Sequence, residues 1–295
     1  MRILNLDNWC EEAKESLNEF EFTHEGMNTY ESEGIIANLK YKFDEKVLRG
    51  YPNLKFIASC TTGLDHIDTD YCEAKGIDII SLKGETDLLR DVWATAEHTW
   101  ALIMSLVRKV PFAFDDVKRG NWDREAWQGT ELRGKTLGVV GYGRVGRQVA
   151  RFAEAFGMYI MIYVPNHPLG ESYLDTVLRR SDIVTVHVPL NTETTGMFGE
   201  EQFKRMKPTA YFINTSRGAV VDEAYLWRAL KDKWIAGAAL DVLENEPNIN
   251  PSLIEYAKQN TNLVLTCHIA GNTAESRKKT QLHIANKIKE CVNGL

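Results

Sequence analysis

The sequence predicts an α/β protein built from parallel β-sheets that helices cover on both faces. Short apolar segments rich in valine and isoleucine alternate with amphipathic segments along the whole chain, a pattern typical of repeated βαβ units. In addition, the strand-like run of residues 136–140 ends at a glycine turn, after which apolar residues recur at helical spacing. With 295 residues, the chain is long enough for two domains of this kind.

The expected strands form two arrays. The first array precedes the glycine turn, and the second begins with the strand that leads into this turn. The first array comprises residues 2–6, 34–37, 55–59 and 77–80, and the second comprises residues 136–140, 159–163, 183–187, 210–214, 236–241 and 262–266. Amphipathic segments such as residues 10–20 and 44–49 lie between strands and are expected to be helices. The pattern therefore predicts two doubly wound parallel sheets.

Two other segments organise the chain. Residues 96–108 are apolar almost all round, so this helix must be buried on most sides, between domains or against a second subunit. Residues 273–291 predict a final polar helix with a few apolar positions. Four tryptophans near the first of these helices are expected to serve packing: Trp93, Trp100, Trp122 and Trp127.

Composition and charge argue against several kinds of partner. The net charge of −6 disfavours nucleic acid and anionic membranes, and no apolar run is long enough to span a bilayer. Acidic residues follow the N-terminal strand at once, which is not typical of a signal peptide. The five scattered cysteines are expected to be reduced and mostly buried in a cytoplasmic protein, and no residue cluster has the spacing of a metal site.

The glycine turn carries the first functional prediction. Gly141 permits a tight turn, Gly143 allows a pyrophosphate to approach the backbone, and Gly146 allows the following helix to pack closely on the strand. The free amides at the start of the helix would then face the phosphates, aided by the helix dipole. The strand before the motif and the helix after it favour dinucleotide binding over a purely structural turn.

Polar side chains follow three later strands, at the edge of a parallel sheet where ligands bind. They are Arg217, Asp241, Glu246 and His268. Taken singly, such an arginine could form a surface ion pair, a glutamate before proline could end a strand, and a histidine could be a core residue. Their joint placement favours a site, because arginine binds carboxylates bidentately and a histidine beside a carboxylate can donate a proton near neutral pH.

Five ordered motifs resemble those of the D-isomer-specific 2-hydroxyacid dehydrogenase family, which is phosphoglycerate dehydrogenase-like and uses NAD or NADP. The motifs are GYGRVG (141–146), HVPL (187–190), NTSRG (214–218), LDVLENEP (240–247) and HIAG (268–271). The resemblance implies a Rossmann cofactor domain inserted into a flavodoxin-like substrate domain. The cofactor domain would be residues 97–271, and the discontinuous substrate domain would be residues 1–96 and 272–295.

The resemblance also implies a role for each catalytic residue. Arg217 would bind the substrate carboxylate and polarise the carbonyl at C2. His268 would be the acid or base at the reacting oxygen, and Glu246 would hold His268 in its protonated orientation. This division of labour suits the reduction of a 2-keto acid, because negative charge develops on oxygen in that reaction.

Binding residues are assigned by the same resemblance. Asp241 would contact the nicotinamide carboxamide. The expected cofactor-binding set is Gly141, Gly143, Arg144, Val145, Gly146, Val164, Pro165, Val188, Pro189, Thr194, Thr215, Ser216, Arg217, Asp241, His268 and Gly271. The expected substrate-binding set is Thr62, Gly63, Leu64, Arg217 and His268. The helix region of residues 96–110 would join two subunits into a homodimer.

The sequence departs from the family in ways that bear on the cofactor. Val164 stands where the family usually has an aspartate for the ribose hydroxyls of NAD, and His167 is the nearby candidate for the extra phosphate of NADP. NAD is favoured, with NADP as the alternative. The connection over residues 165–182 is short, which would leave the adenine pocket open. Cys267 replaces the usual proline before His268, a change expected to be neutral.

Two alternatives to a simple D-2-hydroxy acid dehydrogenase stay open. Residues 81–91 form a charged loop whose Lys83 and Arg90 could contact the second anionic group of a phosphorylated hydroxy acid such as 3-phosphoglycerate, unless the loop is merely solvated. A binding protein that senses NAD(H) without turnover would keep the same site residues. It would also need tails or docking extensions, which this compact chain does not show.

Overall fold

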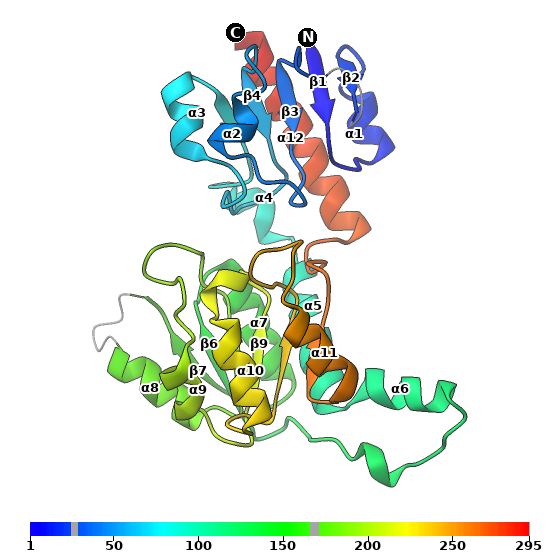
Figure 1. The fold of residues 1–295 in the computed structure, drawn as a ribbon, viewed down its shortest axis with the longest axis vertical. Coiled ribbons are helices and arrows are strands. Elements are labelled where there is room, and N and C mark those ends of the chain that lie inside the picture. Colours follow the sequence, from blue (N-terminus) through cyan, green and yellow to red (C-terminus); the bar gives the residue numbers. More distant parts are fainter. Residues whose placement is uncertain (25–28, 166–170, 295) are drawn as a thin grey trace. The chain divides into compact units, whose positions relative to one another are not determined.

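The computed structural model describes residues 1–24, 29–165 and 171–294. The chain divides into two compact units: unit 1 comprises Met1–Val92 and Asn272–Leu295, and unit 2 comprises Trp93–Gly271. The chain therefore leaves unit 1 once, completes unit 2, and returns to unit 1 for its last helix. Each unit has a central sheet with helices packed on it (Figure 1).

Unit 1 contains a sheet of parallel strands in the order β2-β1-β3-β4-β5. The strands are β1 (Arg2–Asn5), β2 (Glu21–Thr23), β3 (Gly34–Ile36), β4 (Phe56–Ala58) and β5 (Asp78–Ile80). The helices are α1 (Glu11–Glu15), α2 (Glu45–Leu48), α3 (Thr69–Lys75), α4 (Thr86–Arg90) and α12 (Ala274–Gly294). The sequence does not predict β2, because this edge strand is only three residues long and largely polar.

Alternate residues of the unit 1 strands point into two separate cores. Ile3 and Ile36 face one core, together with residues of α1 and α12, whereas Leu4 and Ile35 face the other, together with residues of α2 and α3. Side chains of a strand alternate between the two faces of a sheet, so both faces of this sheet are covered. This arrangement is typical of a doubly wound parallel sheet.

Unit 2 contains a second parallel sheet, in the order β11-β10-β9-β8-β6-β7. Its strands are β6 (Thr136–Val140), β7 (Tyr159–Tyr163), β8 (Ile183–Val186), β9 (Tyr211–Asn214), β10 (Gly237–Leu240) and β11 (Leu263–Leu265). Its α-helices are α5 (Ala94–Val107), α6 (Val110–Lys118), α7 (Arg144–Ala155), α8 (Glu171–Arg180), α9 (Glu200–Arg205), α10 (Glu223–Lys231) and α11 (Pro251–Gln259). The predicted fold class, two parallel-sheet α/β domains, is thereby confirmed.

The strand order of unit 2 reverses between β6 and β8. The chain places β7 on one side of β6 and then crosses to β8 on the other side. Because all the strands are parallel, their carboxyl ends lie at one edge of the sheet. Open α/β sheets bind ligands at this edge, next to the point where the strand order reverses.

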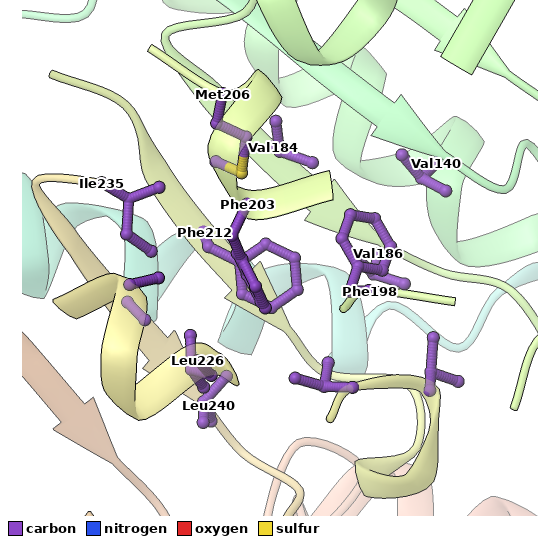
Figure 2. Close-up of a cluster of buried hydrophobic side chains, with 14 of the residues drawn as sticks. Val140, Val184, Val186, Phe198, Phe203, Met206, Phe212, Leu226, Ile235 and Leu240 are labelled. Atoms are coloured by element: carbon purple, nitrogen blue, oxygen red, sulfur yellow. The ribbon is translucent and has the colours of Figure 1, made fainter. Parts of the chain in front are cut away.

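The larger core of unit 2 is centred on three buried phenylalanines. The ring centroids of Phe198, Phe203 and Phe212 lie 4.9 to 6.2 Å apart. Figure 2 shows these rings beside Val184 and Val186 of β8. The opposite face of the sheet packs against α5 and α7, so this sheet is also covered on both sides.

The apolar helix expected at residues 96–108 is α5, and unit 2 itself buries most of it. Trp100 donates from Nε1 to the carbonyl oxygen of Val149 at 3.0 Å, and its ring stacks on Phe156 with the centroids 4.6 Å apart. Trp122 is 88% exposed, so the prediction that it packs is wrong. The reason is that it follows α6, a helix with no buried residue.

Three other predictions need correction. The helix expected over residues 10–20 ends at Glu15, because the chain must turn before β2. The charged segment 81–91 is not only a loop: it contains α4, which inserts Leu89 into the core. The cysteines are not mostly buried as expected: Cys72 is buried, Cys267 is exposed, and the other three are half-buried.

The structure also bears on the cysteines and on the possibility of a membrane-spanning helix. All five cysteines are free thiols in the structure. Among the described helices, none is both long enough and apolar enough to cross a membrane.

Candidate functional site

The glycine turn lies between β6 and α7, where the strand order reverses. Gly141 has a φ of 96°, and a Cβ there would lie 2.6 to 2.7 Å from the backbone of His187 and Val188. A Cβ on Gly143, just before α7, would meet nothing within 4 Å, so the start of the helix is open to a ligand. A Cβ on Gly146 would lie 2.1 Å from the carbonyl oxygen of Gly141. These three positions fit a dinucleotide-binding turn.

Replacing Gly146 by alanine should destabilise unit 2. The new Cβ would overlap the Gly141 carbonyl, so α7 would have to move away from β6, at a cost of about 1–3 kcal/mol for an overpacked site. Thermal unfolding measures the loss. The matched control is Gly143→Ala, whose Cβ has free space and should leave Tm nearly unchanged while obstructing a dinucleotide. An unchanged Tm for Gly146→Ala would contradict the close packing of α7.

The other predicted cofactor-binding residues around the turn follow neighbouring strands. Arg144 and Val145 begin α7, Val164 and Pro165 follow β7, and Val188 and Pro189 follow β8. Val164 is partly exposed and offers no hydrogen-bonding side chain to a ribose. His167 lies outside the described residues.

Two polar residues after β8, Thr194 and His187, form hydrogen bonds within the protein. The buried Thr194 hydroxyl donates to the carbonyl oxygen of Pro189 at 2.6 Å and accepts from the Asn191 N–H at 2.9 Å, so it shapes the loop after β8. Burial lowers the pKa of His187 to about 3. His187 is therefore neutral at physiological pH, and its Nε2 lies 2.9 Å from the Thr185 hydroxyl.

Asn214, the last residue of β9, organises the turn that carries Arg217. Its Nδ2 donates to the carbonyl oxygen of Arg217 at 2.9 Å, and its Oδ1 accepts from the N–H and the hydroxyl of Ser216 at 2.9 and 2.8 Å. The Thr215 hydroxyl lies 2.9 Å from the Thr99 hydroxyl of α5. Asn214 stands in the NTSRG motif without a predicted role, although asparagine commonly bonds to the backbone of its own turn.

Gly218 brings the Arg217 turn against the loop that carries Glu246. A Cβ on Gly218 would lie 2.0 Å from the carbonyl carbon of Leu243 and 2.4 Å from the nitrogen of Glu244. A residue with a side chain could not allow this approach. The segment with the arginine and the segment with the glutamate are therefore in direct backbone contact.

Glu223, the first residue of α10, supports the loop that carries Glu246, and no pattern in the sequence predicts this role. Its buried carboxyl accepts from the N–H of Glu244 at 2.6 Å. Burial raises the pKa of this carboxyl. In the sequence, Glu223 stands in the first turn of a helix, directly after the N-cap Asp222. A glutamate at such a position is ordinarily explained by the helix dipole, so the sequence does not mark it as part of a site.

Glu246 and His268 are in direct contact although they are 22 positions apart in the sequence. The distance from His268 Nδ1 to Glu246 Oε2 is 2.7 Å, and Glu246 Oε1 accepts from the N–H of Leu243 at 2.6 Å. An ionised carboxylate only accepts hydrogen bonds, so His268 donates from Nδ1 and its Nε2 is left for another partner. This arrangement prepares the imidazole to exchange a proton through Nε2.

Asp241 is completely buried at the end of β10. Its carboxylate accepts from the Thr266 hydroxyl at 2.6 Å and from the N–H groups of Ile269 and Ala270 at 2.9 and 2.8 Å. Burial by itself would raise its pKa, but the hydrogen bonds from His98, Thr266 and the backbone outweigh burial and hold the pKa below its usual value. A contact with a nicotinamide carboxamide stays a prediction.

The residues expected to bind the substrate from unit 1 follow β4. Thr62 is exposed, and the Gly63 carbonyl accepts from the Thr61 hydroxyl at 2.8 Å. The carbonyl of Leu64 accepts from the N–H of Ile67 at 2.9 Å, which closes the loop as a turn. Within unit 1, Arg90 forms an ion pair with Asp87, and Lys83 is exposed.

The carboxyl edge of the unit 2 sheet thus collects an open glycine turn, a cation and a histidine–carboxylate pair. The cation is Arg217, whose Nη1 donates to the carbonyl of Ser216 at 2.9 Å. Gly271, the last predicted cofactor residue, ends the segment after His268, and a Cβ there would meet nothing within 4 Å. Over the described ranges, no group of three or more His, Cys, Asp or Glu side chains could hold a metal ion.

Comparison with known proteins agrees with this geometry. Residues 100–270 match the family described as "D-isomer specific 2-hydroxyacid dehydrogenase, NAD binding domain". The chain is 40% identical to a glyoxylate reductase of Thermococcus litoralis over 263 residues, which cover 84% of this chain and 77% of that protein. It is 38% identical to a D-3-phosphoglycerate dehydrogenase of Archaeoglobus fulgidus over 89% of this chain, but it spans only half the length of that relative.

Solved structures give the same result. A D-lactate dehydrogenase from Aquifex aeolicus, solved in complex with NAD and lactic acid, has a TM-score of 0.83 and 30% identity, with 100% of this chain and 95% of that chain covered. The TT0316 protein from Thermus thermophilus has a TM-score of 0.86 and 31% identity over 100% of this chain and 97% of that chain. These matches confirm the resemblance and NAD as the cofactor: the chain belongs to the D-isomer-specific 2-hydroxyacid dehydrogenase family, whose members are NAD-dependent oxidoreductases of hydroxy acids.

Proposed function

We propose that this chain interconverts a D-2-hydroxy acid and its 2-keto acid. Arg217 binds the carboxylate and polarises the C2 carbonyl, and the Glu246–His268 pair acts as acid and base. The observation that carries the proposal is the 2.7 Å contact between His268 Nδ1 and Glu246, on a loop in backbone contact with the Arg217 turn. Such a pair places the proton-donating nitrogen on the side away from the carboxylate.

In the proposed reduction, NADH supplies the hydride that reaches C2 of the keto acid. His268 gives the proton on Nε2 to the carbonyl oxygen, so the C=O double bond becomes a C–O single bond and new C–H and O–H bonds form. The guanidinium of Arg217 stabilises the negative charge that develops on this oxygen. In the oxidation direction, His268 removes the hydroxyl proton through the same nitrogen, and Glu246 stabilises the imidazolium that results.

The division of labour between the units is part of the proposal. We assign dinucleotide binding, predicted for residues 97–271, to unit 2 (Trp93–Gly271), whose open turn at Gly143 fits a pyrophosphate. We assign substrate binding, predicted for residues 1–96 and 272–295, to unit 1. Within it, Thr62, Gly63 and Leu64 would bind the substrate carboxylate with backbone amides.

The substrate we favour is a small, unphosphorylated D-2-hydroxy acid. The relatives include glyoxylate reductases and a D-lactate dehydrogenase as well as D-3-phosphoglycerate dehydrogenases. A phosphorylated substrate needs a second cationic group. In the charged segment, Lys83 and Arg90 are the cations that could serve that alternative, and Arg90 forms an exposed ion pair with Asp87.

The direct test is oxidation of NADH and NADPH with a panel of 2-keto acids. Glyoxylate, pyruvate and hydroxypyruvate represent small substrates, and 3-phosphohydroxypyruvate represents the phosphorylated alternative. We expect turnover with NADH and at least one unphosphorylated acid. Tight dinucleotide binding without turnover of any acid would instead support a protein that senses NAD(H).

Replacing Val164 by aspartate should strengthen NADH binding. The new carboxylate would stand at the end of β7, where the side chain is partly exposed, and could accept hydrogen bonds from both ribose hydroxyls. We expect Kd for NADH to fall by about 10-fold, the effect of about 1.4 kcal/mol. Fluorescence titration measures it, with Val164→Asn as the uncharged control. An unchanged Kd would mean that the ribose is held elsewhere.

We also propose a homodimer in which the region of residues 96–110 and the adjoining α6 take part. Supporting this, α6 has no buried residue, and Val110, Phe114 and Val117 form an exposed apolar stripe at helical spacing, with Trp122 beyond it. Light scattering should give twice the chain mass. Phe114→Glu should give the single mass, whereas Tyr159→Glu, at an exposed position of the edge strand β7, should not. A monomeric wild type would contradict the dimer.

The proposed location is the cytoplasm. The five free thiols of the structure, of which Cys72 is buried, are compatible with a reducing compartment.

A further inference from the structure

We propose that His98 and Thr266 are positioning residues, which act through Asp241 to set the conformation of the loop that carries His268. None of these three residues belongs to the predicted acid–base pair. The inference rests on the proposed function, because it assigns His268 as the group whose position matters. It is carried by one connected set of hydrogen bonds within unit 2.

The first step is the direction of the hydrogen bonds. The Thr266 hydroxyl has one proton, and at 2.6 Å from an Asp241 carboxylate oxygen it donates that proton to the carboxylate. His98 Nε2 lies 3.0 Å from the same hydroxyl oxygen, which can then only accept. His98 Nε2 must therefore carry a hydrogen. The chain of donors runs from His98 on α5, through Thr266 at the end of β11, to Asp241 at the end of β10.

The second step is charge. Asp241 is completely buried, and His98 Nε2 lies 3.3 Å from its Oδ1. A buried carboxylate is costly unless donors surround it. Thr266 and His98 supply the side-chain donors, and the backbone of the His268 loop supplies the others. Removal of a side-chain donor therefore changes how strongly Asp241 holds the backbone of that loop.

The third step is the loop itself. Residues 268–270 each direct their N–H at Asp241: His268 to its carbonyl oxygen at 2.8 Å, and Ile269 and Ala270 to its two carboxylate oxygens at 2.9 and 2.8 Å. His268 has a φ of 55°, a left-handed conformation that a residue with a side chain adopts only when its surroundings hold it there. Asp241 supplies these surroundings, and the resulting orientation brings Nδ1 to Glu246.

Two matched pairs of variants test the proposal. Thr266→Val removes the hydroxyl at nearly constant volume, whereas Thr266→Ser keeps it. His98→Leu removes the donor, whereas His98→Gln keeps an N–H donor. We expect Thr266→Val and His98→Leu to lower kcat by about 10- to 100-fold, because small misplacements of a reacting group cost this much. KM for NADH and for the keto acid should change less than about threefold, and the Ser and Gln variants should recover most of kcat.

A double variant tests whether the two residues serve the same carboxylate. The Nε2 hydrogen of His98 is within reach of both the Thr266 hydroxyl and Asp241 Oδ1, so the kcat loss of the double variant His98→Leu/Thr266→Val should differ from the product of the two single losses. A loss equal to that product would overturn the coupling of the two residues through Asp241. Equal kcat for the Val and Ser variants would overturn the positioning role of Thr266. If kcat in a variant fell only in proportion to the fraction of molecules that still bind NADH, the role of His98 and Thr266 would be merely structural.

A measurement independent of turnover separates this proposal from the proposed function. Hydrogen exchange of the Ile269 and Ala270 amides should be slow in the wild type and in Thr266→Ser, and at least about 10-fold faster in Thr266→Val. This result would stand even if the wild type reduced no 2-keto acid, in which case the proposed function alone would fail. Equal exchange in all three proteins would overturn the positioning role itself.

Discussion

Replacing His268 by glutamine is expected to lower kcat by about 10²- to 10⁴-fold, the usual contribution of a general acid or base. Glutamine keeps an N–H that can reach Glu246 but cannot transfer a proton at neutral pH. Since the dinucleotide turn lies on β6 and α7, Kd for NADH should stay within about threefold. Single-turnover oxidation of NADH and fluorescence titration measure the two quantities separately.

The matched control for this prediction is His283→Gln. His283 also pairs with a carboxylate, that of Glu85 at 3.0 Å, but it lies in α12 of unit 1. Its kcat should remain within about twofold of the wild type, since a partly exposed ion pair contributes little. If His268→Gln were as active as His283→Gln, another group would have to supply the proton, and the proposed mechanism would be wrong.

Replacing Arg217 by alanine is expected to lower kcat/KM for the keto acid by about 10³-fold or more. Two contributions are lost together: a bidentate bond to the carboxylate, which is made in both the ground and transition states, and stabilisation of the oxyanion, worth about 10²- to 10³-fold in kcat. KM should therefore rise and kcat should fall. Steady-state kinetics over a range of keto acid concentrations separates the two effects.

Arg217→Lys shows whether the planar fork matters. Lysine keeps the charge but cannot bond bidentately, so its kcat/KM should lie between those of the wild type and Arg217→Ala. Arg205→Ala is the matched surface control, because Arg205 pairs with Asp175 and Glu201 on the outside of unit 2, and it should be nearly silent. Wild-type kinetics for Arg217→Ala would remove the carboxylate-binding role.

The sequence predicts the parallel architecture well because both sheets are buried on two faces. Strands such as Ile183–Val186 are then completely buried and mostly apolar, which contrasts strongly with the helices around them. The strand Glu21–Thr23 escapes prediction because it lies at a sheet edge and has little apolar character. The exposure of Trp122 escapes prediction because a large apolar side chain is buried on average, but its hydrophobicity does not tell whether it follows a helix with no buried face.

The candidate site is predictable where one motif contains the whole feature and is not where distant segments combine. The glycine turn is local, so Gly141, Gly143 and Gly146 can be assigned directly from their spacing. His98 and Thr266 are 168 positions apart, and neither stands in a recognisable motif with the other. Glu223 is likewise inconspicuous in the sequence, and its role becomes visible only through its hydrogen bond to Glu244.

The contact between Gly218 and the backbone of residues 243–244 also limits how this protein can be engineered. Because the two segments touch without an intervening side chain, neither can be exchanged for the loop of a relative while the other is kept. In a chimaera that takes only one of these segments from a relative, the new segment would not fit against the segment that was kept. Transplanting substrate preference into this scaffold therefore requires that residues 214–218 and 241–247 be moved as one cassette, or that both be left in place and the variation be confined to unit 1.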